Sequence, residues 1–438
     1  MKPEIKTCLA QIRAGEIPQG YKNTPIGILK SDWSYAKLNE IVDILTETAG
    51  KKQYETLSIS AGMGFVNQAK KFGKELSGKQ YEKYIVLRKG DFSYNKGNSK
   101  AYPQGCIYRL NDRAEAAVPN VFESFRIANG YPEYYEQLFI AGFLNSQLYR
   151  FINHGIRDDG LLNLTEKDFY SCIVPVPPLE EQQRIASILS AQDKVIELCE
   201  RKLEQLKRMK KYYLQNMFPK DGEEYPEIRF KGFTDAWEQR KVSSLITDIA
   251  DGPFGSNLKT EHYTDEKEAR IIQLSNLSDN GWQEENTRYT TFEHANEIKR
   301  CIVNEGELVM GKMMPAGMTI IRPNTEKMYV LSSDCVRIKL DNNIAINKFF
   351  LYTTKSDTFL NQVNNDSQGS TRIRTSISKI RDMDISLPSV PEQEKIGEYF
   401  TNLDTLITLH QRKCEEEKKK KKALQQLLLT GISRINYE

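Results

Sequence analysis

The segment Val174-Pro-Val-Pro-Pro-Leu-Glu-Glu-Gln-Gln-Arg-Ile185 returns later in the chain as Ile385-Ser-Leu-Pro-Ser-Val-Pro-Glu-Gln-Glu-Lys-Ile396. The two copies stay in register without gaps for roughly forty residues, as a duplicated structural unit would. Upstream, Trp33-Ser-Tyr-Ala-Lys-Leu38 matches Trp237-Glu-Gln-Arg-Lys-Val242 in the same order. The sequence therefore predicts one unit used twice, a mixed globular domain followed by a long helix.

A seven-residue repeat of mostly apolar side chains follows each copy, with alternating spacings of three and four that are typical of a coiled-coil seam. The first seam reads Ile185, Leu189, Gln192, Ile196, Cys199, Leu203, Leu206, Lys210, Tyr213 and Met217. The second reads Ile396, Phe400, Leu403, Ile407, His410, Cys414, Glu417, Lys421, Leu424 and Leu428, and it is weaker in its middle. We expect the helix pair to depend on the large apolar members Ile185, Leu189, Ile196, Leu203, Leu206, Ile396, Phe400, Leu403, Ile407 and Leu424.

Capping and turn residues mark the helix ends. Pro178 and Pro219 bracket the first helix, whereas Ser389 with Glu392 forms a capping-box pattern and Gly431 follows the second seam. A helix of roughly 36 residues is on the order of 54 Å long, which exceeds the roughly 34 Å of one DNA turn. Equivalent places in a duplicated chain favour an antiparallel pair with pseudo-twofold symmetry, which would hold two domains at a fixed separation.

Two features of the second helix allow a functional and a structural interpretation. The run Glu415-Glu-Glu-Lys-Lys-Lys-Lys-Lys422 could bind nucleic acid, but its Glu and Lys residues at a spacing of four favour a solvated helix face. His410 on the seam is expected to be a packed histidine rather than a metal ligand, because no second histidine or carboxylate lies at helical spacing beside it.

The composition is that of a globular protein with more charge than average, with 39% hydrophobic and 28% charged residues, and 438 residues suit two domains. No apolar run approaches the roughly 20 residues of a membrane span, and the start of the chain lacks a signal-peptide core. We therefore expect a cytoplasmic protein without a membrane partner. The seven scattered cysteines favour reduced thiols over disulfides or a metal site. With a net charge of +3, any positive surface for DNA must be local.

Motifs of an independent enzyme are missing from the sequence. It contains no G-x-x-x-x-G-K-[ST] phosphate loop, no G-x-G-x-x-G, no [ND]-P-P-[YF] and no H-E-x-x-H. We therefore predict a binding protein with no catalytic residues. The alternative is a self-sufficient DNA-acting enzyme with an unrecognised carboxylate site, since 59 acidic residues can conceal one.

The duplicated domain, the Pro-x-Pro-Pro-x-Glu-Glu-Gln-x-x-Ile segment and the long coiled-coil helices together resemble the specificity subunits of Type I restriction and modification systems. The resemblance is strongest at Val174 to Met217, at Leu387 to Leu428 and at the joining segment Pro226 to Lys241, and it covers the whole chain in organisation. It implies two target-recognition domains that each read half of a split, asymmetric site in double-stranded DNA.

The resemblance also implies partners that carry the chemistry. Two methyltransferase subunits would dock on the helices, bind S-adenosylmethionine and methylate adenine, and motor-nuclease subunits would consume ATP with Mg²⁺. No cofactor is expected on this chain.

The predicted fold is α+β, with two mixed α/β target-recognition domains, two long antiparallel coiled-coil helices and an internal pseudo-twofold duplication. The first recognition domain is expected at 1–173 and the first helix at 174–218. The second domain follows at 219–384, with 219–236 as a joining segment, and the second helix at 385–438.

Candidate DNA contacts in the first domain come from polar and basic loops. Phe92 to Lys100 combines glycine with Tyr94, Asn95, Lys96, Asn98 and Lys100. In this loop Lys96 and Lys100 would neutralise phosphates, and Asn95 or Asn98 could pair with an adenine edge. A solvated hairpin turn is the alternative. Lys52, in a basic and aromatic cluster, and Arg157 are further candidates.

Candidates in the second domain lie in two glycine-containing segments and one turn. Asp251 to Lys259 resembles a loop of the family's recognition domains, and there Gly255 and Ser256 would let phosphate approach the backbone and Lys259 would add charge. Gln368, Ser370, Arg372 and Arg374 precede the return to the second helix, where the arginines could grip phosphate or guanine. Lys312 aligns with Lys96 when Lys89-Gly-Asp-Phe92 is matched to Glu305-Gly-Glu-Leu308.

Overall fold

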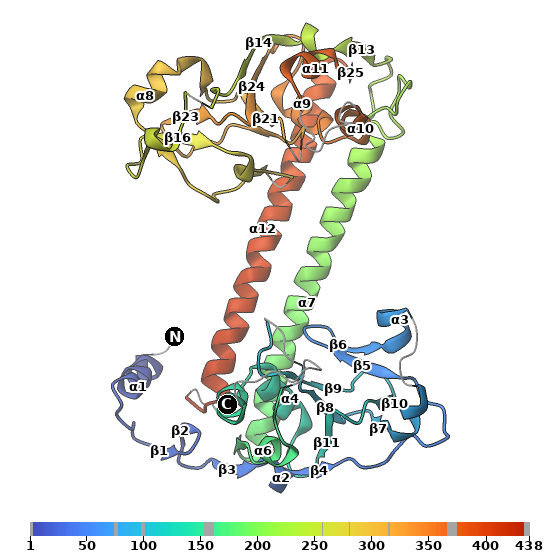
Figure 1. The fold of residues 1–438 in the computed structure, drawn as a ribbon, viewed down its shortest axis with the longest axis vertical. Coiled ribbons are helices and arrows are strands. Elements are labelled where there is room, and N and C mark those ends of the chain that lie inside the picture. Colours follow the sequence, from blue (N-terminus) through green and yellow to red (C-terminus); the bar gives the residue numbers. More distant parts are fainter. Residues whose placement is uncertain are drawn as a thin grey trace. The chain divides into compact units, whose positions relative to one another are not determined.

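The computed structural model describes residues 3–73, 78–97, 101–152, 162–255, 257–279, 281–313, 316–365 and 375–432. The chain forms two compact units, unit 1 (Met1–Leu198 with Cys414–Glu438) and unit 2 (Cys199–Lys413) (Figure 1). Each is a mixed domain that takes in half of each long helix, α7 (Leu179–Asn216) and α12 (Val390–Leu428). The predicted fold class is thereby confirmed. The predicted boundaries follow the sequence repeat, whereas these units follow contacts. In the described part of the chain, no helix is long and apolar enough to cross a membrane.

Unit 1 is built around the four-stranded antiparallel sheet β4-β11-β8-β9, with the two-stranded sheets β1-β2, β3-β12, β5-β6 and β7-β10. Its further helices are α1 (Pro3–Arg13), α2 (Leu38–Ile41), α3 (Gln68–Phe72), α4 (Pro132–Ile140), α5 (Asn145–Phe151) and α6 (Glu166–Tyr170). Its strands are β1 (Tyr21–Thr24), β2 (Gly27–Lys30), β3 (Ser34–Lys37), β4 (Val42–Ile44), β5 (Leu57–Ser60), β6 (Gly64–Asn67), β7 (Ile85–Arg88), β8 (Phe92–Asn95), β9 (Cys106–Arg109), β10 (Glu115–Val118), β11 (Glu123–Ile127) and β12 (Ile173–Val176).

Unit 2 repeats the four-stranded sheet as β14-β24-β21-β22 and adds the five-stranded sheet β15-β19-β16-β23-β20, in which β16 and β23 are parallel. Its further helices are α8 (Phe292–Glu297), α9 (Asn347–Thr353), α10 (Asp357–Asn365) and α11 (Ile377–Asp382). Its strands are β13 (Glu238–Lys241), β14 (Ile246–Asp251), β15 (Tyr263–Thr264), β16 (Ala269–Ile272), β17 (Leu277–Ser278), β18 (Gly281–Trp282), β19 (Tyr289–Thr290), β20 (Ile302–Val303), β21 (Leu308–Gly311), β22 (Thr319–Ile321), β23 (Met328–Leu331), β24 (Cys335–Leu340) and β25 (Asp384–Leu387).

In both units, one strand before the central sheet in the chain and one strand after it pair with the same register. In unit 1, β3 pairs with β12 so that Ala36 lies opposite Val174. In unit 2, β13 pairs with β25 so that Arg240 lies opposite Ile385, the residue that aligns with Val174. These two-stranded sheets close each domain just before a long helix begins, which explains why the duplicated sequence extends across both strands.

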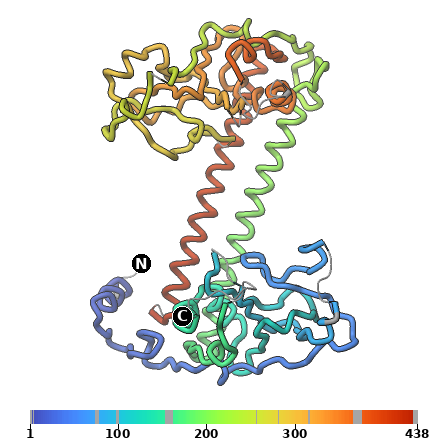
Figure 2. Tube along the Cα trace, in the orientation of Figure 1, coloured from blue at the N-terminus to red at the C-terminus, as the bar shows by residue number. Residues whose placement is uncertain are grey.

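Each domain core is completed by the end of a long helix. In unit 1, Leu428 and Leu429 at the end of α12 pack in the core that contains Trp33. In unit 2, Met217 and Phe218 at the end of α7 pack around Trp237. The C-terminal end of α12 therefore returns to the N-terminal segment of unit 1 (Figure 2). Burial of these large side chains fixes the helix ends, since each contributes roughly 1.5–3 kcal/mol.

Within each unit the halves of α7 and α12 run antiparallel. In unit 2, Leu206 packs with Leu403 and Ile407 in a small apolar cluster, to which Leu203 adds a half-buried contact. In unit 1, Gln192 Nε2 donates to a carboxylate oxygen of Glu417 (2.6 Å). The expected seam residues Ile185, Leu189, Leu424, Ile396 and Phe400 lie in or against the domain cores, and Ile196 is half-buried.

Candidate nucleic-acid interface and helix junctions

One buried glutamine in each copy of the repeat joins a long helix to its domain. The Gln182 side chain accepts a hydrogen bond from the backbone N–H of Tyr131 (2.8 Å), and that of Gln393 accepts one from Ile346 (2.9 Å). Tyr131 and Ile346 are the N-cap residues of α4 and α9, one residue before each helix begins. Each glutamine also donates to the carbonyl oxygen of the proline five residues before it (2.8 and 3.0 Å). The glutamine therefore fixes the first domain helix against the long helix in both units.

The glutamate that precedes each glutamine is a buried anion with a cation from its own unit. Glu181 accepts from Lys30 Nζ (3.0 Å) and Trp33 Nε1 (2.9 Å). Both carboxylate oxygens of Glu392 accept from Arg229 (2.7 and 2.8 Å). The Ser389 and Glu392 pattern predicted the start of the second helix, and α12 does begin at Val390, while the Glu392 carboxylate binds Arg229. Buried carboxylates need such partners to offset the cost of desolvation.

Two ion pairs join α7 to α12 at equivalent positions, one in each unit. Asp193 binds Lys421 (2.5 Å) in unit 1, and Asp404 binds Lys210 (2.5 Å) in unit 2. Each carboxylate also accepts a hydrogen bond (2.8 Å) from a domain helix, α4 in unit 1 and α9 in unit 2. Both lysines stand at predicted seam positions, but their partners were not foreseen. In the aligned repeat, Asp193 matches Asp404 and Lys210 matches Lys421. This agreement of charged residues between the two copies could have predicted both ion pairs.

His410 lies at the middle of the helix pair in unit 2 and acts as a packed histidine. Its Nδ1–H donates to the carbonyl oxygen of Leu406 (3.0 Å), and its own carbonyl oxygen accepts from Cys199 Sγ (3.8 Å). Cys199 and His410 are 211 residues apart and occupy equivalent positions in the two copies. Among the described residues, no group of three or more His, Cys, Asp or Glu side chains is placed to hold a metal ion.

The DNA-contact candidates of the β8 strand are largely occupied by internal contacts. Tyr94 is fully buried, stacks on Phe169 with ring centroids 4.5 Å apart, and donates from its hydroxyl to a backbone carbonyl. It cannot contact DNA, so that prediction was wrong. Asn95 is half-buried and binds backbone groups through both its amide nitrogen (3.2 Å) and its oxygen (2.8 Å). Lys96 is mostly buried and ion-paired with Glu123 (2.5 Å).

Lys312, the counterpart of Lys96, is also buried and ion-paired. Its side chain is 6% exposed, and its ammonium group is ion-paired with Asp251. The prediction of a phosphate contact at Lys312 was therefore wrong, because the buried ammonium, already paired with Asp251, is not accessible to a phosphate. Lys96 and Lys312, in equivalent turns of the two units, thus each form an internal ion pair with a structural role.

Three candidates are accessible. Lys52 is exposed, lies over the Tyr54 ring (4.5 Å from its centroid) and is ion-paired with Glu115 (3.3 Å). Hydrogen bonds to these two side chains raise the pKa of Lys52, so the group stays cationic. The Lys259 side chain is 53% exposed, and around Gly255 the space that a side chain would occupy is open. The candidates Asn98, Lys100, Arg157, Ser256, Gln368, Ser370, Arg372 and Arg374 lie outside the described residues.

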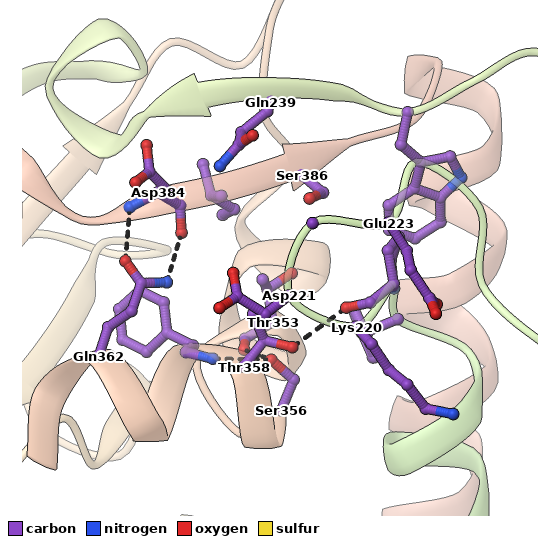
Figure 3. A pocket seen from close by; sticks show the side chains of 16 residues that line it. Lys220, Asp221, Glu223, Gln239, Thr353, Ser356, Thr358, Gln362, Asp384 and Ser386 are labelled. Atoms are coloured by element: carbon purple, nitrogen blue, oxygen red, sulfur yellow. Dashed lines mark hydrogen bonds between the residues drawn. The ribbon is translucent and has the colours of Figure 1, made fainter. Parts of the chain in front are cut away.

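A polar pocket of unit 2 lies beside the turn that follows α7 (Figure 3). Gln362 bridges to the backbone of Asp384, accepting from its N–H (2.8 Å) and donating to its carbonyl oxygen (3.0 Å). Thr358 Oγ1 donates to the carbonyl oxygen of Pro219 (3.1 Å). These bonds join α10 to β25 and to the end of α7, so the pocket walls belong to the junction of helix and domain.

The buried cysteines have the character of structural residues. Burial raises the pKa of Cys106 to about 11 and that of both Cys172 and Cys335 to about 12. At neutral pH these thiols stay protonated, and a protonated thiol is a poor nucleophile. Their environment therefore favours a packing role over thiol catalysis.

Comparison with known proteins places this architecture in a family. The family profile described as Type I restriction modification DNA specificity domain matches residues 30–208 and 237–418, most of the chain. The Type I restriction enzyme MjaVIII specificity subunit of Methanocaldococcus jannaschii is 24% identical over 294 residues, 65% of this chain and 68% of that protein. The putative type I restriction enzyme MjaX specificity subunit of the same organism is 22% identical, over 95% and 97% of the two chains.

Solved structures show the same fold. One, from work on complex assembly and conformational transition of the type I R-M system, has a TM-score of 0.54 at 15% identity and covers 92% of this chain and 99% of that one. The Type-I restriction-modification system S subunit from M. genitalium has a TM-score of 0.50 at 13% identity, with coverage of 92% and 97%. The family profile matches both halves of the repeat, and the chain therefore belongs to the Type I restriction modification DNA specificity domain family.

Proposed function

We propose that this chain is the DNA-specificity subunit of a Type I restriction and modification complex. It binds a bipartite, asymmetric site in double-stranded DNA, with one half-site for each unit, and it performs no catalysis. The observation that carries the proposal is that the contacts between the long helices and the domains are the same in both units, whereas the sheets of the proposed recognition regions differ. The glutamine, glutamate and ion-pair contacts recur in both units, whereas unit 2 has a five-stranded sheet and unit 1 has the separate sheets β5-β6 and β7-β10.

The chemistry belongs to partner subunits in this proposal. Two methyltransferase subunits supply S-adenosylmethionine and methylate adenine, and motor-nuclease subunits consume ATP with Mg²⁺. The complex works in the cytoplasm, where its DNA is. Among the described candidates, Lys52 and Lys259 are exposed cations, and each can exchange its surface ion pair, with Glu115 and with Glu261, for a DNA phosphate.

Two equivalent apolar patches on the long helices are suited to two copies of one methyltransferase subunit. The first consists of Val195 and Leu198 on α7, which are 42% and 60% exposed. The second consists of Leu406 and Leu409 on α12, at 45% and 54%. Within each patch the residues are three apart, so they share one helix face. The patches occur at matching places in the two copies of the repeat, as docking sites for identical subunits would. Large apolar side chains exposed together commonly mark protein interfaces.

The test is to reconstitute the methylase from this chain and its methyltransferase subunits, and to map the modified adenines in genomic DNA. A single bipartite asymmetric motif is expected. Replacing 242–383 with the corresponding region of a related subunit should change one half of that motif only. Cleavage of DNA by the purified chain with Mg²⁺ alone would refute the proposal in favour of a self-sufficient enzyme.

A further inference from the structure

The two units contain pockets of similar size at equivalent positions. The unit 1 pocket, of about 280 Å³, is lined by Gly105 before β9 and by Ile140 at the end of α4. The unit 2 pocket, of about 230 Å³, is lined by Gly317 before β22 and by Lys355 after α9. Ile140 follows Tyr131 by the same number of residues as Lys355 follows Ile346. Tyr131 and Ile346 are the residues whose backbone N–H groups bind Gln182 and Gln393.

The glycines support this equivalence because both have a left-handed backbone, with φ of +76° at Gly105 and +82° at Gly317. A side chain at Gly105 would meet the backbone oxygen of Asn95 at 2.4 Å, and one at Gly317 would meet Val363 at 3.1 Å. Both pockets therefore rely on a glycine turn that closes a hairpin of the central sheet.

The lining chemistry differs between the two units. The unit 1 pocket has the aromatic and aliphatic side chains of Tyr102, Phe139 and Ile140, and Ile140 is 49% exposed. In the unit 2 pocket, Lys355 replaces the isoleucine, with Thr354 and Asn364 beside it. An apolar pocket in one unit thus corresponds, in the other, to a pocket lined by one cation, Lys355, and one acidic residue, Asp279.

Lys355 has no carboxylate within ion-pair distance among the residues that the structure describes. Its ammonium group donates to the backbone carbonyl of Asp279 (3.0 Å). The nearby carboxylate of Asp404 is already bound by Lys210 (2.5 Å) and by the Tyr352 hydroxyl (2.8 Å). Lys210 and Lys355 lie 5.9 and 5.5 Å from the centroid of the Tyr352 ring, so Lys355 has a second cation nearby. Burial and the charge of Lys210 lower the pKa of Lys355 to about 8, against the opposing charges of Asp404 and Asp279.

The pocket also adjoins, in the chain, a segment predicted to read DNA. Asn364 of α10 closely precedes the segment with Arg372 and Arg374. In the described part of the chain, the Lys355 ammonium is held by a carbonyl oxygen and the Tyr352 ring. An anion would stabilise such a half-buried ammonium, because the anion replaces the lost hydration.

We propose that the unit 2 pocket receives a phosphodiester group of the bound DNA through Lys355, and that the equivalent pocket of unit 1 makes no such ionic contact. The inference rests on the proposed function, because it assumes that unit 2 reads DNA. It assigns to Lys355 a phosphate contact that positions the duplex on one recognition domain only.

The test uses the full chain assembled with its methyltransferase subunits and a duplex that carries the recognised site, with affinity measured between 50 and 200 mM salt. One phosphate contact contributes about 0.9 to the slope of log affinity against log salt. Lys355→Met should lower the slope by about that amount, so the loss of affinity over this range shrinks roughly 3.5-fold. Lys355→Arg should keep the slope. Lys348→Met, on the exposed face of α9, removes the same charge outside the pocket and should leave the slope unchanged.

Three outcomes would overturn the inference. An unchanged slope in Lys355→Met, with DNA binding intact, rejects the pocket assignment alone. A second outcome assigns the pocket to a free anion. In it, phosphate in place of chloride at equal ionic strength raises the Tm of the DNA-free wild-type complex but not that of Lys355→Met, and Lys355→Met leaves the salt slope of DNA binding unchanged. If the wild-type complex binds no duplex, the proposed function fails and the inference fails with it.

Discussion

The helix patches predict a specific failure of assembly when either is charged. Leu198 is 60% exposed and Leu409 is 54% exposed, so a docked subunit could bury somewhat more than half of each side chain. Full burial of a leucine contributes roughly 1.5–3 kcal/mol, which leaves about 1–2 kcal/mol for this share. An aspartate there also adds the cost of burying a carboxylate. Leu198→Asp or Leu409→Asp should therefore weaken one docking site by about 3 kcal/mol or more, on the order of 100-fold.

Native mass spectrometry of mixtures with excess methyltransferase subunit measures this directly. The wild-type chain should bind two subunits, each single variant one, and the double variant none. Lys207→Asp, at an exposed position of α7, introduces the same carboxylate outside the patch and should leave two subunits bound. Two subunits on the double variant would refute docking at the patches. Loss of both subunits in one single variant would refute independent, equivalent sites.

Three further predictions follow from the junctions, the pocket and the helices. Gln393→Met removes three hydrogen bonds. At about 1 kcal/mol each, this should lower Tm in calorimetry by about 6–12 °C, against little change for the exposed Gln183→Met. DNA affinity should fall as pH rises from 7 to 9.5, because Lys355, with a pKa of about 8, binds phosphate only when protonated; Lys355→Arg should abolish this fall. Adding seven residues to both α7 and α12 lengthens each by about 10.5 Å, so adenine mapping should show a spacer up to about three base pairs longer with unchanged half-sites.

The architecture could be predicted because repetition and periodicity are visible in the chain itself. The alignment of Trp33 with Trp237 predicted the equivalence of β3 and β13, whose pairing registers agree. The spacing of three and four placed Leu206, Leu403 and Ile407 on a common seam, where they form one apolar cluster. A helix turns by a fixed angle per residue, so spacing alone determines which side chains share a face.

The contact candidates were harder to predict, because a residue type suited to DNA is equally suited to a buried pair. Tyr94 lies on the central strand β8, with β11 and β9 on either side, and its ring faces Phe169. Lys96 and Lys312 are neutralised by Glu123 and Asp251, which are distant in sequence. The sequence around a lysine does not indicate which distant carboxylate will pair with it, because only the folded chain brings the two together.

These neutralised lysines also indicate where the charge for DNA must come from. Lys96 and Lys312 occupy equivalent turns, and an ion pair at the same place in both units belongs to the frame that the repeat conserves. Charge that serves recognition should instead differ between the units, because the two half-sites differ. Lys355 meets this criterion, since its counterpart Ile140 is uncharged and its own ammonium is held by a carbonyl oxygen and the Tyr352 ring in the described part of unit 2. Differences between equivalent positions, rather than basic clusters as such, are therefore the better guide to specificity in this duplicated chain.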